Sequence, residues 1–421
     1  MRKQLLIVTD KYPVDPGRSP TAWLLEHLRS LEGIADVTVV SLLRMLPRVK
    51  NLILGGYDRR WFRILRALPA VEQPFPHVTV YHRHCLTVPD RLGWKWNPAL
   101  FVLQQQRWLR KLLHRSRFDA VLVHYLHAAT PLARNGARSA GIPLWLDENE
   151  GLEALEAEGQ ARLRRWLLRQ LSSSDIVLTQ CSRQERELSG LLPHIRVHVI
   201  PPGAGDELPA GDIPPPPPFR LLCVSRLDQP GKNVAMLLHA IARLRHEEHL
   251  DVRLTIAGDG YQRRALQRML HTLDIEDIVR FTGWLSSGAL RELRREHHCA
   301  VQPSEHESFG LAALEAVAAG LPLIACADAG VVSDLLAEGA AVQTMHLCTE
   351  KQLVVAIRTA CERLPELQRQ AVEARGRLRE RFSWSAHAEY YAALLGAEDL
   401  SVADPSVTGS GKEHSRDAGR R

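Results

Sequence analysis

The sequence has 421 residues, of which 45% are hydrophobic and 24% are charged. These fractions are typical of a soluble globular protein with a large core, and the length favours two or three packed units over one domain. The formal net charge of +6 is compatible with nucleic acid, an anionic membrane surface or a phosphorylated substrate as partner. No apolar run approaches the roughly 20 residues of a spanning helix, and the N-terminus turns polar too early for a secretory signal, so we expect a cytoplasmic protein.

The first 200 residues alternate between short β-rich segments and helical patterns. This alternation predicts a parallel α/β sheet, and therefore an N-terminal Rossmann-like domain over 1–200. The expected strands are 4–10, 36–42, 78–83, 119–125, 142–147, 175–180 and 197–202.

Five consecutive prolines at 214–218 cannot lie in a helix or a central strand, so they predict a linker over 201–219. A second alternating series follows and predicts another Rossmann-like domain over 220–385. Two doubly wound domains would face each other across a cleft and bind ligands beyond the carboxyl ends of their strands. The expected strands of the second domain are 219–225, 251–258, 278–284, 299–303, 321–326 and 341–344.

The last segments differ in composition from the two domains. Residues 386–400 are expected to form a C-terminal helix that packs back on the N-terminal domain, and the polar tail 401–421 is expected to be disordered. The seven cysteines contain no C-x-x-C pair and lie mostly in apolar runs, so we expect buried, reduced thiols. They are residues 85, 181, 223, 299, 326, 348 and 361.

The segment 304–320, SEHESFGLAALEAVAAG, predicts a turn at Phe309 and Gly310 followed by a helix that ends at Gly320. The helix N-terminus would attract an anion such as phosphate. Glu307 precedes this helix and Glu315 lies one turn inside it, so two carboxylates would flank the anion, as suits a ligand with sugars on both sides of a phosphate. The alternative is that both acids are ordinary helix residues, one of them solvated.

Three further patterns follow predicted strands. In VSRLDQPGKN, Arg226 and Lys232 could clamp a diphosphate, although exposed surface charge is the alternative. The segment is not a Walker loop, because its first glycine is missing and Asn233 replaces the Ser or Thr. In IAGDGYQ and FTGWLS, the glycines at 258, 260 and 283 either let a ligand approach the backbone or form tight turns. No G-x-G-x-x-G is present, so a dinucleotide cofactor is unsupported.

These four patterns occur in the order and spacing of the family 4 retaining glycosyltransferases, which the chain resembles densely over 219–345 and thinly in the N-terminal half. The resemblance implies the GT-B fold and transfer of a sugar, with retention, from a UDP- or GDP-linked donor to a glycan or lipid-linked acceptor. It places the reaction in cell-surface polysaccharide or glycolipid synthesis. It implies no cofactor and no metal, and the sequence has no D-x-D.

The resemblance also assigns roles to residues. Arg226 and Lys232 would bind the donor diphosphate and stabilise the leaving group, Glu307 would hold hydroxyls of the transferred sugar, and Glu315 would hold the ribose. Other donor-binding positions are Gly17 and Gly258, the backbone of Phe309, Gly310 and Leu311 at the phosphate, and Gly283, Trp284 and Leu285 at the base.

The N-terminal half departs from the family pattern. Only Gly17 matches a loop where many relatives have two glycines, and the neighbouring Arg18 could reach an anion. Asn149 stands where many relatives have a histidine, so the acceptor side could use Arg18, His124 or Asn149 itself. Other residues nearby could also serve the acceptor: Asp147, Glu148, Glu150 and His127. A further alternative is that the protein is impaired as an enzyme. Donor-sugar specificity is open too, because Ala329 and Ser333 replace a glycine and a glutamate.

Three basic segments that contain tryptophan, 44–69, 94–117 and 161–171, could lie on an anionic membrane or form ordinary core helices. In the second, Trp108, Leu109, Leu112 and Leu113 share an apolar face. No nucleic-acid-binding module accompanies the charge, so we expect no nucleic acid partner. Alternatives to a transferase are a nucleotide-sugar epimerase of the same fold and a degenerate, non-catalytic nucleotide-sugar-binding protein.

Overall fold

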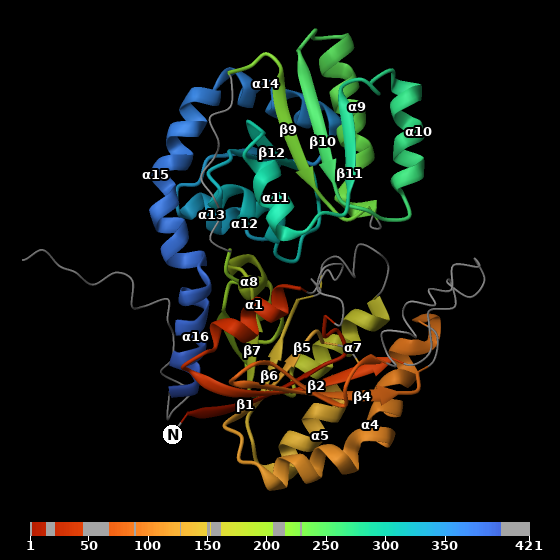
Figure 1. Ribbon diagram of the computed structural model, residues 1–421, viewed down its shortest axis with the longest axis vertical. Helices are drawn as coiled ribbons and strands as arrows, with labels where there is room; N and C mark the ends of the chain where they lie inside the picture. The colour runs from red at the N-terminus through yellow and green to blue at the C-terminus, as the bar shows by residue number, and fades with distance from the viewer. Residues whose placement is uncertain are drawn as a thin grey trace, which may run out of the picture.

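The protein folds into two α/β domains stacked on one another (Figure 1). The computed structural model describes residues 2–13, 22–44, 67–87, 90–126, 128–149, 152, 161–204, 215–227 and 230–396. The predictions for Gly17, Arg18, His127, Glu150, most of segment 44–69 and the tail 401–421 therefore lie outside the described residues.

The N-terminal domain is built on a sheet with strand order β3-β4-β2-β1-β5-β6-β7-β8. Each expected strand of this half is present. Apart from β3 and β4, neighbours in this sheet pair in parallel, for example Leu5 of β1 opposite Val37 of β2 and Ala120 of β5. The strands are β1 (Lys3–Thr9), β2 (Ala35–Arg44), β3 (Val71–Phe75), β4 (Val78–Cys85), β5 (Ala120–His124), β6 (Leu144–Asp147), β7 (Ile176–Thr179) and β8 (Arg196–Val199).

The strand β3 was not predicted, and it runs antiparallel to β4. It lies at the edge of the sheet and contains Pro74, which lacks the N–H of a central strand. Proline is tolerated at an edge, where one side of the strand has no partner. The expectation of an all-parallel N-terminal sheet was therefore wrong at this edge.

The C-terminal domain has the order β11-β10-β9-β12-β13-β14, and its neighbours pair in parallel. The order reverses between β9 and β12, which puts a topological switch point at the carboxyl ends of these two strands. The strands are β9 (Phe219–Val224), β10 (Val252–Ala257), β11 (Val279–Gly283), β12 (Cys299–Gln302), β13 (Leu323–Cys326) and β14 (Val342–Met345).

Helices cover both sheets, and several of their ends match local sequence signals. Ser286 caps α11 and Thr349 caps α14, each accepting a backbone N–H with its side chain. In the described part of the N-terminal domain the helices are α1 (Trp23–Ser30), α4 (Asp90–Arg115), α5 (Thr130–Ala140), α7 (Ala161–Leu171) and α8 (Ser182–Leu191). After them come η2 (Pro230–Lys232), α9 (Val234–His246), α10 (Arg263–Leu273), α11 (Ser287–Arg294), α12 (Leu311–Ala318), α13 (Val332–Ala337), α14 (Glu350–Glu362), α15 (Leu364–Phe382) and α16 (Trp384–Gly396).

The last two helices, drawn in blue, run along both domains (Figure 1). The chain crosses between the domains beside their junction, where Ala204 N donates to Phe382 O at 2.7 Å. Gly203 packs so closely on Trp384 that a Cβ there would lie 2.5 Å from its backbone nitrogen. Beyond this point, α16 buries Tyr391, Leu394 and Leu395 in the core that β1 and β2 form with α1. The C-terminal helix thus packs against the N-terminal domain.

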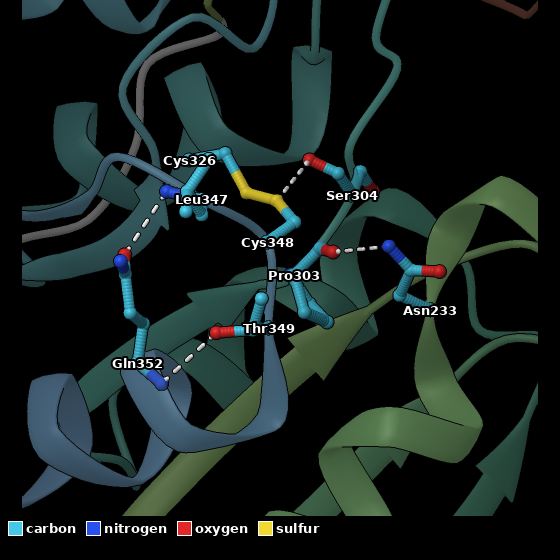
Figure 2. Close-up of a disulfide and its surroundings, with 8 residues drawn as sticks. All are labelled: Asn233, Pro303, Ser304, Cys326, Leu347, Cys348, Thr349 and Gln352. Carbon is cyan, nitrogen blue, oxygen red and sulfur yellow. Dashed lines mark hydrogen bonds between the residues drawn. A yellow bond between two sulfur atoms is a disulfide. The ribbon is translucent and has the colours of Figure 1, made fainter.

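A disulfide joins Cys326 and Cys348, so the expectation of seven reduced thiols was wrong for this pair (Figure 2). Cys326 ends β13 opposite Met345 of β14, and the chain after β14 turns back to bring Cys348 beside it. Their Cα atoms are 6.1 Å apart although 22 residues separate them in sequence. Sequence spacing could not reveal this pair, because the pairing of β13 with β14 sets the distance.

The basic helices α4 and α7 turn their apolar faces inward. Leu109 and Leu113 are buried in the N-terminal core, with Trp108 and Leu112 packed against it. Of the two alternatives for this segment, the structure shows the core helix for the face that contains Trp108, Leu109, Leu112 and Leu113. Within the described residues, no helix is both long and apolar enough to cross a membrane.

Candidate functional site

A cavity of about 790 Å³ lies between the two domains. Its lining comes mainly from loops and residues at the carboxyl ends of strands of both sheets, where open α/β sheets bind ligands. We call its two sides the N-terminal wall and the C-terminal wall. The N-terminal wall is Lys11, Trp23, Tyr125, Asn149, Gln180 and Pro202; the C-terminal wall is Val224, Ser225, Arg226, Lys232, Ala257, Gly258, Trp284, Leu285, Leu290, Gln302 and 307–312.

The C-terminal wall brings Arg226, Lys232 and Glu307 together. Lys232 Nζ lies 2.7 Å from Glu307 Oε1, with 16% and 9% of the two side chains exposed. Gln302 Nε2 donates to the same oxygen at 3.2 Å. A largely desolvated pair of this kind is held firmly in place, because each partner would be costly to leave alone.

Two hydrogen bonds tie the loop after β9 to the loop after β12. Asn233 Nδ2 donates to Pro303 O at 3.1 Å, and Glu305 N donates to Gly231 O at 3.3 Å. Asn233 has a left-handed backbone, with φ of 53°, at the start of α9. It replaces the hydroxyl residue of a Walker loop and acts here as a brace between the segments that carry Lys232 and Glu307.

Gly310 precedes α12 with φ of 93°, a conformation that glycine adopts readily, so the first N–H groups of the helix lie at the cavity. Gly330, which the sequence pattern did not single out, supports this turn from behind. A Cβ at Gly330 would lie 2.1 Å from Phe309 O, and Val331 N donates to the same oxygen at 2.7 Å. The helix N-terminus provides a partial positive charge for an anion, beside Arg226 and Lys232.

Gly258 and Gly283 have positive φ and meet each other, with Gly258 N donating to Gly283 O at 2.9 Å. A Cβ on Gly258 would lie 1.8 Å from Ser225 O. Gly258 is therefore required by the packing of two loops of the wall. Gly283 lies next to Trp284 and Leu285, which line the cavity.

Glu315, the expected ribose ligand, is not among the residues that line the cavity. Its carboxylate forms an ion pair with Arg294 of α11, a residue only 2% exposed. The structure thus separates Glu315 from Glu307, which does line the cavity. Local sequence could not reveal this pair, since Arg294 lies 21 residues away on another helix.

Cys223 of β9 lies buried near the Lys232–Glu307 pair. Burial raises the pKa of its thiol to about 12, with Lys232 lowering it and Glu307 raising it. The thiol is therefore neutral and unsuited to act as a nucleophile.

Trp23 and Tyr125 form the aromatic part of the N-terminal wall. Trp23 Nε1 donates to Tyr125 Oη at 3.0 Å, and Lys11 Nζ lies 4.7 Å from the centre of the Tyr125 ring. Tyr125 follows β5 with φ of 63°, a strained conformation that often occurs at functional sites. Asn149 stands beyond β6 and is 9% exposed.

His124, a predicted acceptor-side candidate, is 1% exposed and lies beneath this wall. It lines a small internal cavity that shares Trp23, Gln180 and Pro202 with the main one. Its Nδ1 is 2.5 Å from Asp147 Oδ2. Neither residue lines the main cavity, and Glu148 is buried and accepts a hydrogen bond from Gln184 at 3.0 Å. Among the acceptor-side candidates that the structure describes, Asn149 is thus the one that lines the main cavity.

Sequence reasoning missed part of the lining. Tyr125 and Gln180 directly follow β5 and β7, and Lys11 follows β1 after Asp10, so the rule that ligands bind beyond strand ends could have found them. Trp23 lies on α1, and no local signal marks it. In the described part of the chain, no group of three His, Cys, Asp or Glu residues could hold a metal ion.

Comparison with known proteins matches residues 218–366 to the family described as glycosyl transferases group 1, and residues 19–203 to the glycosyl transferase 4-like domain. The two matches together span well over half of the chain and both of its domains. The chain belongs to the group 1 glycosyl transferases. The resemblance predicted from the four sequence motifs is thereby confirmed.

Curated relatives of this group 1 glycosyl transferase match only part of it. Glycogen synthase of Mycobacterium tuberculosis is 35% identical over 188 residues, covering 43% of this chain and 44% of that protein. The MMP alpha-(1->4)-mannosyltransferase of Mycolicibacterium hassiacum is 31% identical over 176 residues, covering 42% of each. The chain thus spans less than half the length of these relatives.

Solved structures cover almost the whole chain. Sucrose-phosphate synthase of Thermosynechococcus elongatus superposes with a TM-score of 0.73 at 18% identity, covering 93% of this chain and 98% of that one. HepE of Anabaena, in complex with UDP and glucose, superposes with a TM-score of 0.65 at 16% identity, covering 94% and 100%. The fold is GT-B, as predicted.

Proposed function

We propose that this chain is a retaining glycosyltransferase. It transfers a sugar from a UDP- or GDP-linked donor to a hydroxyl of a glycan or lipid-linked acceptor, in cell-surface polysaccharide or glycolipid synthesis in the cytoplasm. HepE is described with UDP and glucose, and another curated relative is described as GDP-mannose-dependent. Both descriptions support a nucleotide-sugar donor here.

The observation that carries the proposal is the arrangement of Arg226, Lys232 and the α12 N-terminus around one cavity between the domains. Glycosyl transfer expels a nucleoside diphosphate, and negative charge develops on the phosphate oxygen in the transition state. Fixed cations and backbone N–H groups directed at that oxygen lower the barrier. They provide the positive charge that the leaving group needs, so the proposed reaction uses no metal.

The environment of the acids favours attack on the same face of the sugar, with the leaving phosphate as the base. Glu307 lines the cavity, but its Oε1 already contacts Lys232 and Gln302. A carboxylate held in this way is placed to accept hydrogen bonds from sugar hydroxyls, and it is a poor covalent nucleophile. Retention then follows without a covalent intermediate.

The proposal is tested with the variants Arg226→Ala and Lys232→Ala. The control is Arg268→Ala, which changes an exposed arginine of α10 away from the cavity. Turnover should fall roughly 100- to 1000-fold in the first two variants and stay unchanged in the third. Beforehand, a thermal-shift screen of UDP, GDP and ADP identifies the donor base, because a ligand that binds only the folded chain raises its melting temperature. Full turnover in both cavity variants would refute the assignment of the phosphate site.

Product analysis separates the transferase from its alternatives. With no acceptor present, an epimerase converts the sugar while it remains linked to the nucleotide, whereas a transferase leaves it unconverted. Binding of a nucleotide sugar with no turnover across a panel of acceptors would instead identify a non-catalytic protein.

We also propose contact with an anionic membrane, through the outer face of α4. Trp96 and Leu103 are 58% and 81% exposed there, and Arg107, Arg110 and Lys111 continue the same exposed side. Apolar groups beside basic ones suit the headgroup region of anionic lipid. The wild type should sediment with phosphatidylglycerol vesicles, and Leu103→Glu should stay in the supernatant. Neither protein should sediment with vesicles of phosphatidylcholine alone.

A further inference from the structure

The N-terminal wall contains a buried amide with unused hydrogen-bonding capacity. Asn149 is 9% exposed, and both Oδ1 and Nδ2 are buried without a hydrogen-bond partner among the described residues. Leaving a buried polar group unsatisfied is costly, and such groups are rare in native proteins. Because Asn149 lines the main cavity, a ligand in that cavity can satisfy it.

The chemistry of the amide limits what that ligand can be. Asn149 has two N–H donors and an oxygen that accepts, and a sugar hydroxyl also both donates and accepts. Beside it stand Trp23 and Tyr125, locked together by the indole-to-phenol hydrogen bond of 3.0 Å. Apolar ring surface combined with a few fixed polar groups is the usual composition of a small-molecule site.

The charge of the lining indicates a second property of the ligand. Among the described lining residues, Lys11, Arg226 and Lys232 are basic and Glu307 is acidic. Arg226 and Lys232 stand on the C-terminal wall, where the donor diphosphate is proposed to bind. Lys11 stands on the opposite wall, where it is the charged residue of the described set. Its charge favours an anion on the second substrate.

We propose that Asn149 and Lys11, against the Trp23–Tyr125 pair, form an acceptor subsite that selects a pyranose carrying a negatively charged substituent. The amide binds ring hydroxyls and the ammonium group binds a phosphate or a carboxylate. This inference rests on the proposed transferase function, since it takes the second sugar in the cavity to be the acceptor.

The test measures binding of three sugars to the full chain by saturation-transfer NMR titration: glucose 6-phosphate, glucuronate and methyl α-glucopyranoside. At least one of the two anionic sugars should bind roughly tenfold more tightly than the neutral one, a difference of about 1.4 kcal/mol. The tighter binder of glucose 6-phosphate and glucuronate shows whether the substituent on the natural ligand is a phosphate or a carboxylate. Equal affinity for all three sugars overturns the proposal.

Variants assign the effect to residues. Lys11→Met should abolish the preference for the anion, and Lys11→Arg should retain it. Lys3→Met changes a lysine at the start of β1 that pairs with Asp119 at the surface, and it should leave the preference unchanged. Asn149→Ala should weaken the binding of all three sugars. A preference that survives Lys11→Met but disappears in Arg226→Ala would place the anion at the donor site and overturn the subsite.

The same experiments separate this inference from the proposed function. If nucleoside diphosphates stabilise the chain but no anionic sugar is preferred, the transferase stands and the subsite is refuted. If anionic sugars bind through Lys11 but no nucleotide binds, the transferase is refuted and the anionic-sugar site stands.

Discussion

At the scale of single residues, the glycines of the cavity differ in what they do. The sequence left open whether Gly258 admits a ligand or forms a turn, and the structure shows it pressed against Ser225 O. By contrast, the side chains of Ala313 and Glu307 lie 3.8 Å or more from the position of a Cβ on Gly310, which is ordinary van der Waals contact. Gly258 is thus needed for packing, and Gly310 for its backbone conformation.

Gly258→Ala should lower the free energy of unfolding by about 2 kcal/mol or more, because the new Cβ collides with a carbonyl oxygen at φ of 144°. Gly190→Ala, in a helix with open space around it, should instead stabilise the protein slightly. Urea denaturation of both variants checks the pair. Equal stability of Gly258→Ala and wild type would contradict the close approach of the two loops.

At the scale of elements, the disulfide joins the end of β13 to the segment after β14, next to the loop that leads from β12 to Glu307 (Figure 2). Cys348 Sγ lies 3.7 Å from Ser304 O in that loop. The crosslink thus fixes the chain behind the C-terminal wall, in a region where β13 and β14 are only four residues long each.

Cys326→Ser combined with Cys348→Ser should lower the stability by about 3 kcal/mol, the loop-closure entropy of a crosslink of this length. Dithiothreitol should lower the melting temperature of the wild type and leave that of the double variant unchanged. Cys361→Ser, which removes a free and partly exposed thiol, is the control and should respond to dithiothreitol as the wild type does. A wild-type melting temperature that does not change with dithiothreitol would contradict the crosslink.

At the scale of the whole molecule, a chain of buried histidines connects the C-terminal helix to the floor beneath the N-terminal wall. His387 Nδ1 lies 2.7 Å from Pro201 O, which can only accept, so this nitrogen carries the proton. His387 Nε2 then accepts from His27 Nδ1 at 2.7 Å, and the His27 ring lies 4.9 Å from that of His124. This arrangement needs His27 and His387 to be neutral.

Stability should therefore fall as the pH drops below 6.5. Burial lowers the pKa of His387 to about 4 and the pKa of His27 well below its ordinary value, and neighbouring histidines lower both further. At His387, the hydrogen bond to Pro201 O and the charge of Asp147 oppose this shift. Between pH 6.5 and about 4 the unfolded chain binds more protons than the folded one. Each histidine then removes up to about 1.4 kcal/mol per pH unit.

Urea midpoints at pH 7.5, 6 and 5 measure this loss. His387→Gln keeps a donor for Pro201 but does not titrate, so its midpoint should depend less on pH. His271→Gln, at an exposed position of α10, should keep the slope of the wild type. A slope that His387→Gln leaves unchanged would show that other groups cause the acid sensitivity.

The sequence by itself determined the elements and the family. Every strand except β3 could be predicted, because each of them is a short contiguous apolar run. The motifs of the C-terminal wall could be predicted because Arg226, Lys232, Glu307 and Gly310 occupy loops and a helix start that directly follow strands. These features depend on residues that are near each other in sequence, so they can be predicted without the structure.

Only the tertiary structure decided which groups meet across long separations. It paired Arg294 with Glu315, crosslinked Cys326 to Cys348, and placed His27 beside His387, 360 residues along the chain. It also brought Lys11 and Asn149 to the wall opposite Arg226. Such contacts depend on strand order and on how the two domains stack, which periodicity and spacing do not encode.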